Sequence, residues 1–246
     1  LLASGLVAPQ NAAQVGKEVG SRQGSAVREQ TAISLKTSAN NGREVTFNIL
    51  AYMAPGMALF FLMFTVSNGG RTLLVERNQG TLPRLLISPT TTAQVLGGKM
   101  LGTYLTGVAQ MLILIVACGL LFQLDWGNPL GVLALVLAAV AGAMGWGMLI
   151  TGLAKTPGQI SAIGSAIMLT FGILGGSFFS LDMMPEWYRW LSKITPNAWG
   201  VEGFTTLAQG GSLADITSTL LALLVMGAVL FGASVAILNR RGFAQP

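Results

Sequence analysis

Five long stretches of this sequence contain no charged residue, and each is long enough to cross a lipid bilayer as a helix. They cover residues 45–70, 100–124, 126–154, 156–181 and 216–239. Each holds at least 24 residues, whereas a helix needs about 20 apolar residues to span the hydrocarbon core. We therefore predict an all-α integral membrane protein, a bundle of five transmembrane helices over roughly residues 47–66, 100–122, 129–153, 160–181 and 217–238.

Composition agrees with a membrane protein and excludes several kinds of chemistry. The 246 residues are 52% hydrophobic and only 9% charged, and they include one cysteine and no histidine. Without histidine, Ser-His and Cys-His catalysis and histidine metal sites are excluded. The single cysteine, Cys118, lies in an apolar stretch and cannot form a disulfide within the chain. We expect no catalytic residue, cofactor site or metal site in this chain.

The positions of lysine and arginine predict the orientation in the membrane. If the C-terminus is cytoplasmic, the inner side holds most basic residues: Arg71, Arg77, Arg84, Lys99, Lys155, Arg240 and Arg241. The short outer loops then hold only Arg189 and Lys193. The positive-inside rule therefore favours an outer N-terminus and an inner C-terminus. The net charge of +5 reflects this bias and does not indicate nucleic-acid binding.

The N-terminal segment predicts an outer domain rather than a sixth span. The chain starts at Leu1, and no signal or span precedes the segment that the orientation places outside. We therefore expect the sequence to be a fragment that lacks an upstream helix. Residues 1–46 are predicted to be the C-terminal part of an extracytoplasmic domain, and residues 47–246 the transmembrane domain.

A short charged island, residues 76–89, separates the first two spans and predicts a small helix at the membrane surface. Its leucines recur at i, i+3 and i+4 and so form one apolar stripe: Leu82, Leu85 and Leu86. Gly80 and Thr81 supply a break and a candidate N-cap, and Pro89 stops the helix. Such a helix is too short to cross a bilayer. It would present its stripe to a partner or, alternatively, lie on the inner leaflet.

Residues 182–210 predict a pair of amphipathic helices on the outer side. The apolar residues of the first helix repeat at helical spacing: Met183, Met184, Trp187, Trp190, Leu191 and Ile194. Pro196 ends this helix, and a second apolar-faced piece continues to Gly210. Two interpretations remain open, a passive aromatic belt at the lipid headgroups and a gate at the outer mouth. The candidate gate residues are Trp187, Trp190, Pro196 and Glu202, with a hinge at Pro196 and Gly200.

Three stretches together resemble ABC-2 type ABC transporter permeases. The island 76–89 resembles their E-R-E-x-G-T-L-x-x-L-x-x-x-P signature, and departs from it at Asn78 and Pro83. Residues 52–56 resemble the family's Pro-Gly helix, and residues 184–203 resemble its outer helical pair. The similarity covers about residues 47–241, with the drug- and antibiotic-export branch as the nearest likeness.

The resemblance implies a permease subunit of an ATP-binding cassette exporter in the bacterial inner membrane. Such permeases have six spans, with a large outer domain after the first, and they pair as homo- or heterodimers. Each would dock an ATP-binding subunit, which binds the ATP and Mg²⁺, through the island. The implied docking residues are Glu76, Arg77, Gly80, Thr81, Leu82, Arg84, Leu85, Leu86 and Pro89. The transported substrate is not implied.

Two other classes of membrane protein remain as alternatives. A secondary carrier or channel usually places ionisable residues inside its spans, and none lies near the middle of these. A non-transporting membrane anchor or assembly factor is the second alternative. A neighbouring or fused gene for a Walker-type ATPase would favour the permease over both, since the chain itself has no phosphate-binding loop.

Overall fold

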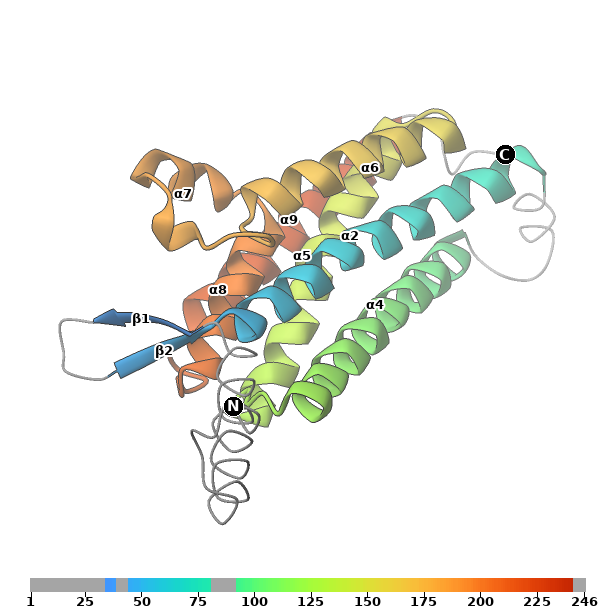
Figure 1. Cartoon of the computed structure of the whole chain (residues 1–246). Helices are drawn as coiled ribbons and strands as arrows, with labels where there is room; N and C mark the ends of the chain where they lie inside the picture. The colour runs from blue at the N-terminus through green and yellow to red at the C-terminus, as the bar shows by residue number, and fades with distance from the viewer. Residues whose placement is uncertain (1–33, 39–43, 81–91, 241–246) are drawn as a thin grey trace, which may run out of the picture. The chain divides into compact units, whose positions relative to one another are not determined.

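The structure, a computed structural model, describes residues 34–38, 44–80 and 92–240 (Figure 1). The chain divides into two compact units, Leu1–Ile49 and Leu50–Pro246. The smaller unit contains an antiparallel pair of strands, and the larger unit is built of helices. The boundary between them falls close to the start of the first predicted span.

The strand pair of the N-terminal unit is a feature that the sequence reading did not predict. Strand β1 (Ser34–Ser38) pairs with β2 (Glu44–Asn48), so that Ser34 lies opposite Asn48 and Ser38 opposite Glu44. Alternating polar and apolar residues in β2 are typical of a strand with two different faces. The assignment of residues 1–46 to an extracytoplasmic domain stays a prediction.

The five predicted transmembrane helices of the larger unit are confirmed, and all five are long and apolar enough to cross a bilayer. They are α2 (Ile49–Asn78), α4 (Thr92–Phe122), α5 (Pro129–Leu153), α6 (Pro157–Leu174) and α9 (Thr217–Arg240). The predicted bounds need three larger corrections. Helix α4 begins at Thr92, eight residues before the predicted residue 100. Helix α2 continues past residue 66 to Asn78, and α6 stops at Leu174 instead of continuing to residue 181. Gly176, at φ +74°, turns the chain away after α6.

Two of the spans begin with a capping residue followed by proline. The Asn128 side chain accepts the N–H groups of Leu130 and Gly131 before Pro129 opens α5. The Thr156 hydroxyl accepts the N–H of Gln159 before Pro157 opens α6. Because a short polar side chain satisfies free N–H groups and proline suits the first helical position, these pairs fix where the two helices start.

Helix α5 forms the centre of the helical bundle (Figure 1). Of an 18-residue apolar stretch in α5, 67% is buried inside the structure, compared with 17% of the corresponding stretches in α4 and α9. Its contact with α9 is close because both helices carry glycine where they meet. A Cβ on Gly227 would lie 2.7 Å from the Ala141 carbonyl oxygen, and the Ser234 hydroxyl donates to the Met148 carbonyl at 2.6 Å. Small residues therefore bring the two backbones together, as in other membrane bundles.

Helix α2 is seated on α5 and α6 in a similar way. A Cβ on Gly147 of α5 would lie 2.1 Å from Cγ1 of Val66. A Cβ on Gly164 of α6 would lie 2.9 Å from Cβ of Ser67. These glycines leave no room for a side chain, so α2 packs against the backbone of both neighbours.

Candidate functional site

The beginning of the charged island is the last part of α2. Glu76 and Arg77 belong to this helix, which ends at Asn78. Gly80 follows at φ +70°, a conformation that favours glycine, so the predicted break there is confirmed. The remaining docking candidates lie outside the described residues: Thr81, Leu82, Arg84, Leu85, Leu86 and Pro89. Their short helix stays a prediction.

Glu76 forms an ion pair with Lys99, which lies early in α4. Its Oε2 atom is 2.5 Å from Nζ of Lys99. This contact was not predicted from the sequence, where Lys99 was considered only as one of the inner positive charges. The signal that could have found it is the place of the two residues, since each lies at the edge of an apolar span.

One face of α2 is exposed and becomes polar along its length. Phe61 and Phe64 are about half exposed, and Asn68, Arg71 and Thr72 are exposed after them. Positions 61, 64, 68, 71 and 72 follow helical spacing and therefore share a face. Helices α4 and α9 expose many large hydrophobic side chains, for example Leu105 and Val225. Helix α2 thus differs from the helices whose outer surfaces suit lipid.

The predicted pair of helices between α6 and α9 is present. A 3-10 turn, η1 (Leu181–Met183), leads into α7 (Glu186–Ser192), which is followed by α8 (Pro196–Ala208). Trp187 is 66% and Trp190 79% exposed. Helix α8 instead buries an apolar face in the bundle, with Ala198, Val201, Phe204 and Leu207 almost inaccessible. Only α7 therefore presents large apolar side chains to its surroundings.

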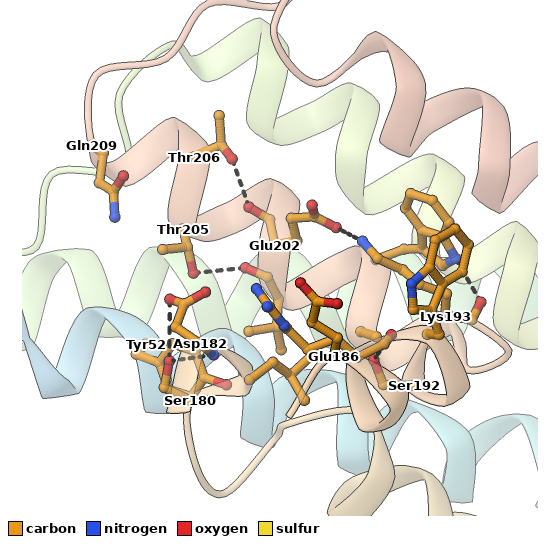
Figure 2. A pocket seen from close by; sticks show the side chains of 16 residues that line it. Tyr52, Ser180, Asp182, Glu186, Ser192, Lys193, Glu202, Thr205, Thr206 and Gln209 are labelled. Carbon is orange, nitrogen blue, oxygen red and sulfur yellow. Dashed lines mark hydrogen bonds and ion pairs between the residues drawn. The ribbon is translucent and has the colours of Figure 1, made fainter. Parts of the chain in front are cut away.

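The polar faces of α7 and α8 enclose a pocket of about 890 Å³. Its lining includes charged and aromatic groups: Tyr52, Asp182, Glu186, Arg189, Trp190, Lys193, Trp199 and Glu202. In Figure 2 the Lys193 ammonium and the Glu202 carboxylate point toward one another as an ion pair. Ser180 and Asp182 lie at the other side of the pocket, where the serine hydroxyl is 3.3 Å from the carboxylate. The lining of the pocket thus combines charged, polar and aromatic side chains from α2, η1, α7 and α8.

Several contacts hold the corner between α7 and α8, and the hinge predicted there stays a prediction. Pro196 is the first residue of α8 and is buried, while the Thr195 side chain caps the helix. The Trp199 indole donates to the Lys193 carbonyl at 2.7 Å, and the Lys193 ammonium lies 3.9 Å from the centre of the Trp199 ring. Gly200 lies inside α8, where a Cβ would be 2.5 Å from Cδ1 of Leu59. The absence of a side chain at Gly200 therefore lets α8 pack closely against Leu59.

Hydrogen bonds attach the outer helical pair to the spans. The Tyr52 hydroxyl of α2 lies within reach of the Gly176 and Phe179 carbonyls, the latter at 2.7 Å. The buried Asn197 amide donates to the Ser177 hydroxyl at 3.0 Å. The Tyr188 hydroxyl of α7 donates to the Ile173 carbonyl at 2.9 Å, and burial raises the pKa of this phenol.

A capping pair fixes the loop that leads from α8 into α9. The Asp215 carboxylate accepts from the Ser212 N–H at 2.7 Å and from the Ser212 hydroxyl at 2.8 Å. These hydrogen bonds favour the charged form, so they lower the pKa of Asp215. The carboxylate is therefore a structural group of this turn.

Comparison with known protein families matches residues 4–236 to the family described as ABC-2 family transporter protein. The chain belongs to this family. The resemblance to ABC-2 permeases that the island and the outer helices indicated is thereby confirmed, and the chain is a multi-pass membrane protein whose described residues include five apolar spans.

Curated relatives of this ABC-2 family chain are named as permeases. The linearmycin resistance permease protein LnrN of Bacillus subtilis is 27% identical over 209 residues, which cover 85% of this chain and 54% of that protein. The probable multidrug ABC transporter permease YbhR of Escherichia coli is 27% identical over 172 residues, or 68% of this chain and 46% of YbhR. The E. coli inner membrane transport permease YadH is 26% identical over 163 residues, or 64% of this chain and 62% of YadH. The chain spans about half the length of the first two of these proteins.

The ABC-2 signature thus covers residues with different surroundings. Glu76 is engaged with α4, whereas the leucine stripe lies beyond the described part of the island.

Of the four gate candidates, Trp190 and Glu202 line the pocket, Trp187 is exposed, and Pro196 is buried at the start of α8. The structure therefore groups two of these candidates in one cavity.

Proposed function

We propose that this chain lines the translocation path of an ABC exporter and forms its membrane part with a second permease subunit. The exposed polar face of α2 carries the proposal. Asn68 lies eight residues before Glu76, or about 12 Å along the helix, and so lies within the thickness of the membrane. An amide without a hydrogen-bonding partner in hydrocarbon costs about 2–7 kcal/mol. Facing water or a second subunit avoids this cost, and facing lipid does not.

The second subunit supplies the other wall of the path. Phe61 and Phe64 offer an apolar surface above the polar residues of the same face. A water-filled path that is lined from two chains needs such a mixed surface, since part of it packs and part of it is wetted. The pair of subunits is either a homodimer or a heterodimer.

The island couples this path to a separate ATP-binding subunit. The stripe of Leu82, Leu85 and Leu86 enters a groove on that subunit, and Arg77 and Arg84 fix its register. ATP and Mg²⁺ are bound by the partner, so the chain itself has no catalytic role. The signature in residues 76–89 and the family membership support this assignment. The names of the relatives support a drug or antibiotic as the exported substrate.

The protein lies in the bacterial inner membrane with the island in the cytoplasm. The basic residues beside the ends of α2, α4 and α5 support this orientation: Arg71, Lys99 and Lys155. The outer helical pair, with its exposed tryptophans, then lies at the opposite surface. Exposed tryptophan is common where a membrane meets water.

The path is tested by the water accessibility of α2. In a Cys118→Ala background, we expect Asn68→Cys to react with a charged, membrane-impermeant thiol reagent in detergent-free membrane vesicles opened to both sides. Val225→Cys on α9 is the matched control. The Val225 side chain is 58% exposed and faces lipid in this proposal, so the cysteine should stay unreactive. Equal protection of both cysteines would contradict a wetted path along α2.

The coupling role is tested at the leucine stripe. Leu85→Asp places an unpaired charge in the apolar groove of the ATP-binding subunit, which is costly. We expect the permease to insert normally and to lose co-purification with its co-expressed ATP-binding subunit. Ile87→Asp, which is two residues from Leu85 and therefore off the stripe of the same predicted helix, is the control and should keep the association. Association of the Leu85→Asp variant at the wild-type level would rule out docking through this stripe.

A further inference from the structure

The two helices that flank the proposed coupling segment are joined by an ion pair. Glu76, near the end of α2, and Lys99, near the start of α4, have their charged atoms 2.5 Å apart. Their side chains are 24% and 32% exposed, so both are largely removed from water. Each helix makes its own backbone hydrogen bonds without this contact. The ion pair therefore fixes where the two helix ends lie relative to one another.

The ion pair continues a line of contacts between α2 and α4. A Cβ on Gly69 would lie 2.5 Å from Cγ2 and Oγ1 of Thr103, which marks a close approach of the two helices. Glu76 lies about two turns after Gly69, and Lys99 about one turn before Thr103. Glu76 thus shares a face of α2 with Gly69, and Lys99 shares a face of α4 with Thr103. Glu76 lies about one turn further from the Gly69–Thr103 contact than Lys99 does, and the long lysine side chain covers this distance.

The surroundings make this ion pair sensitive to the loss of either charge. Glu76 closes the apolar span Tyr52–Glu76, and Lys99 lies two residues inside the span Gly97–Phe122. A charge at such an edge is unfavourable unless an opposite charge or water compensates it. Removal of Glu76 leaves the Lys99 charge without this partner, and removal of Lys99 takes one compensating charge away from Glu76. Either loss costs more than the pair gained by forming. The pair is therefore specific to these two helix ends.

We propose that Glu76 is a positioning residue, which holds the two ends of the coupling segment together through Lys99 and does not contact the ATP-binding subunit. This inference rests on the proposed coupling function. Movement of the segment reaches α2 and α4 as one unit while the ion pair is intact. When the pair is broken, the segment docks but moves without displacing both helices.

The test compares single variants with an exchange of the two charges. Glu76→Gln and Lys99→Met each break the pair from one side, and the double variant Glu76→Lys/Lys99→Glu restores it in reverse. Each permease is co-expressed with its ATP-binding subunit. Insertion, co-purification and permease-dependent ATP hydrolysis are measured. We expect each single variant to keep co-purification and to lose about tenfold in permease-dependent hydrolysis.

The exchanged pair should recover most of this loss, and Lys155→Met, which removes an exposed lysine between α5 and α6, should have no effect. Recovery is the readout that separates positioning through Lys99 from contact with the partner. If the exchanged pair is as poor as the single variants, or if the single variants are silent, the proposal is wrong. If a single variant fails to insert, recovery of insertion by the exchange supports the pair, and its absence refutes it.

Leu85→Asp distinguishes failure of this proposal from failure of the coupling function on which it rests. Suppose that Leu85→Asp loses association and that the exchanged pair does not recover ATP hydrolysis. Docking through the leucine stripe would then stand, and only the positioning role of Glu76 would be refuted. Wild-type association of Leu85→Asp would instead remove the coupling function.

Discussion

The contact between α5 and α9 allows a quantitative test, because one glycine of α9 touches backbone and another touches nothing. A Cβ added at Gly227 would lie 2.7 Å from the oxygen and 3.0 Å from the carbonyl carbon of Ala141. A Cβ added at Gly232 would meet no atom within 4 Å. The neighbours of Gly227 are backbone atoms of a helix and cannot rotate away. The structure therefore predicts opposite outcomes for the same substitution in one helix.

Gly227→Ala should destabilise the protein by about 2–3 kcal/mol relative to Gly232→Ala. Overpacking a well-packed interior costs about 1–3 kcal/mol, and contacts with fixed backbone place this site near the upper end. Replacing a helical glycine by alanine also gains up to about 1 kcal/mol. This gain is common to both variants and cancels in their difference. For a domain of this size, the difference corresponds to about 4–12 °C in the apparent midpoint of thermal unfolding.

The measurement is the fraction of monodisperse protein that remains after heating in detergent. Both variants and the wild type are heated at the same rate, because the unfolding of such proteins is often irreversible and the midpoint then depends on the rate. Gly145→Ala, which meets Gly227 from the α5 side at 2.9 Å, should resemble Gly227→Ala. Coinciding midpoints for Gly227→Ala and Gly232→Ala would refute the close backbone contact.

Two further predictions concern orientation and the outer corner. In a Cys118→Ala background, Ser38→Cys should react with an impermeant thiol reagent added to intact cells and Ser88→Cys should not; the reverse pattern would overturn the orientation. A bifunctional thiol reagent that joins cysteines at Lys193 and Glu202 should leave permease-dependent ATP hydrolysis unchanged, because Trp199 and Thr195 already fix this corner; a loss after complete crosslinking would show that the corner bends during the cycle.

The spans and several of their starts could be predicted because local chemistry decides them. A stretch without charges is a direct consequence of the hydrocarbon core, so the number of spans follows from the sequence. The predicted start of α5 at residue 129 is correct, whereas α6 begins at Pro157 and not at the predicted residue 160. The local pairs Asn128–Pro129 and Thr156–Pro157 fix both starts, since capping and proline geometry act within a few residues. The end of α2 does not follow in this way. Hydropathy detects the edge of the membrane, and a helix can continue beyond that edge through Arg71 and Glu76.

Glycine and the charged residues of the island could not be interpreted from sequence because their roles depend on distant partners. Gly200 after Pro196 is equally typical of a hinge and of a close contact. The close approach of Gly200 to Leu59 on α2 is visible only in the structure. Glu76 likewise stands in the same signature as the leucine stripe. Its partner Lys99 lies 23 positions further along the chain, and nothing local connects the two.

Helix α2 is the element that connects the two candidate regions, and this determines which motions are physically available. At one end Tyr52 bonds the turn after α6, and Leu59 packs against α8. At the other end Glu76 pairs with Lys99. The three glycines of α2 are closely packed. Cβ atoms on Gly56, Gly69 and Gly70 would lie 2.6 Å from the Ser177 carbonyl oxygen, 2.5 Å from Thr103 and 1.9 Å from Thr151. A push on the island should therefore displace α2 as a rod, and any gate at the outer surface should move with α2 and α8 together instead of opening at Pro196.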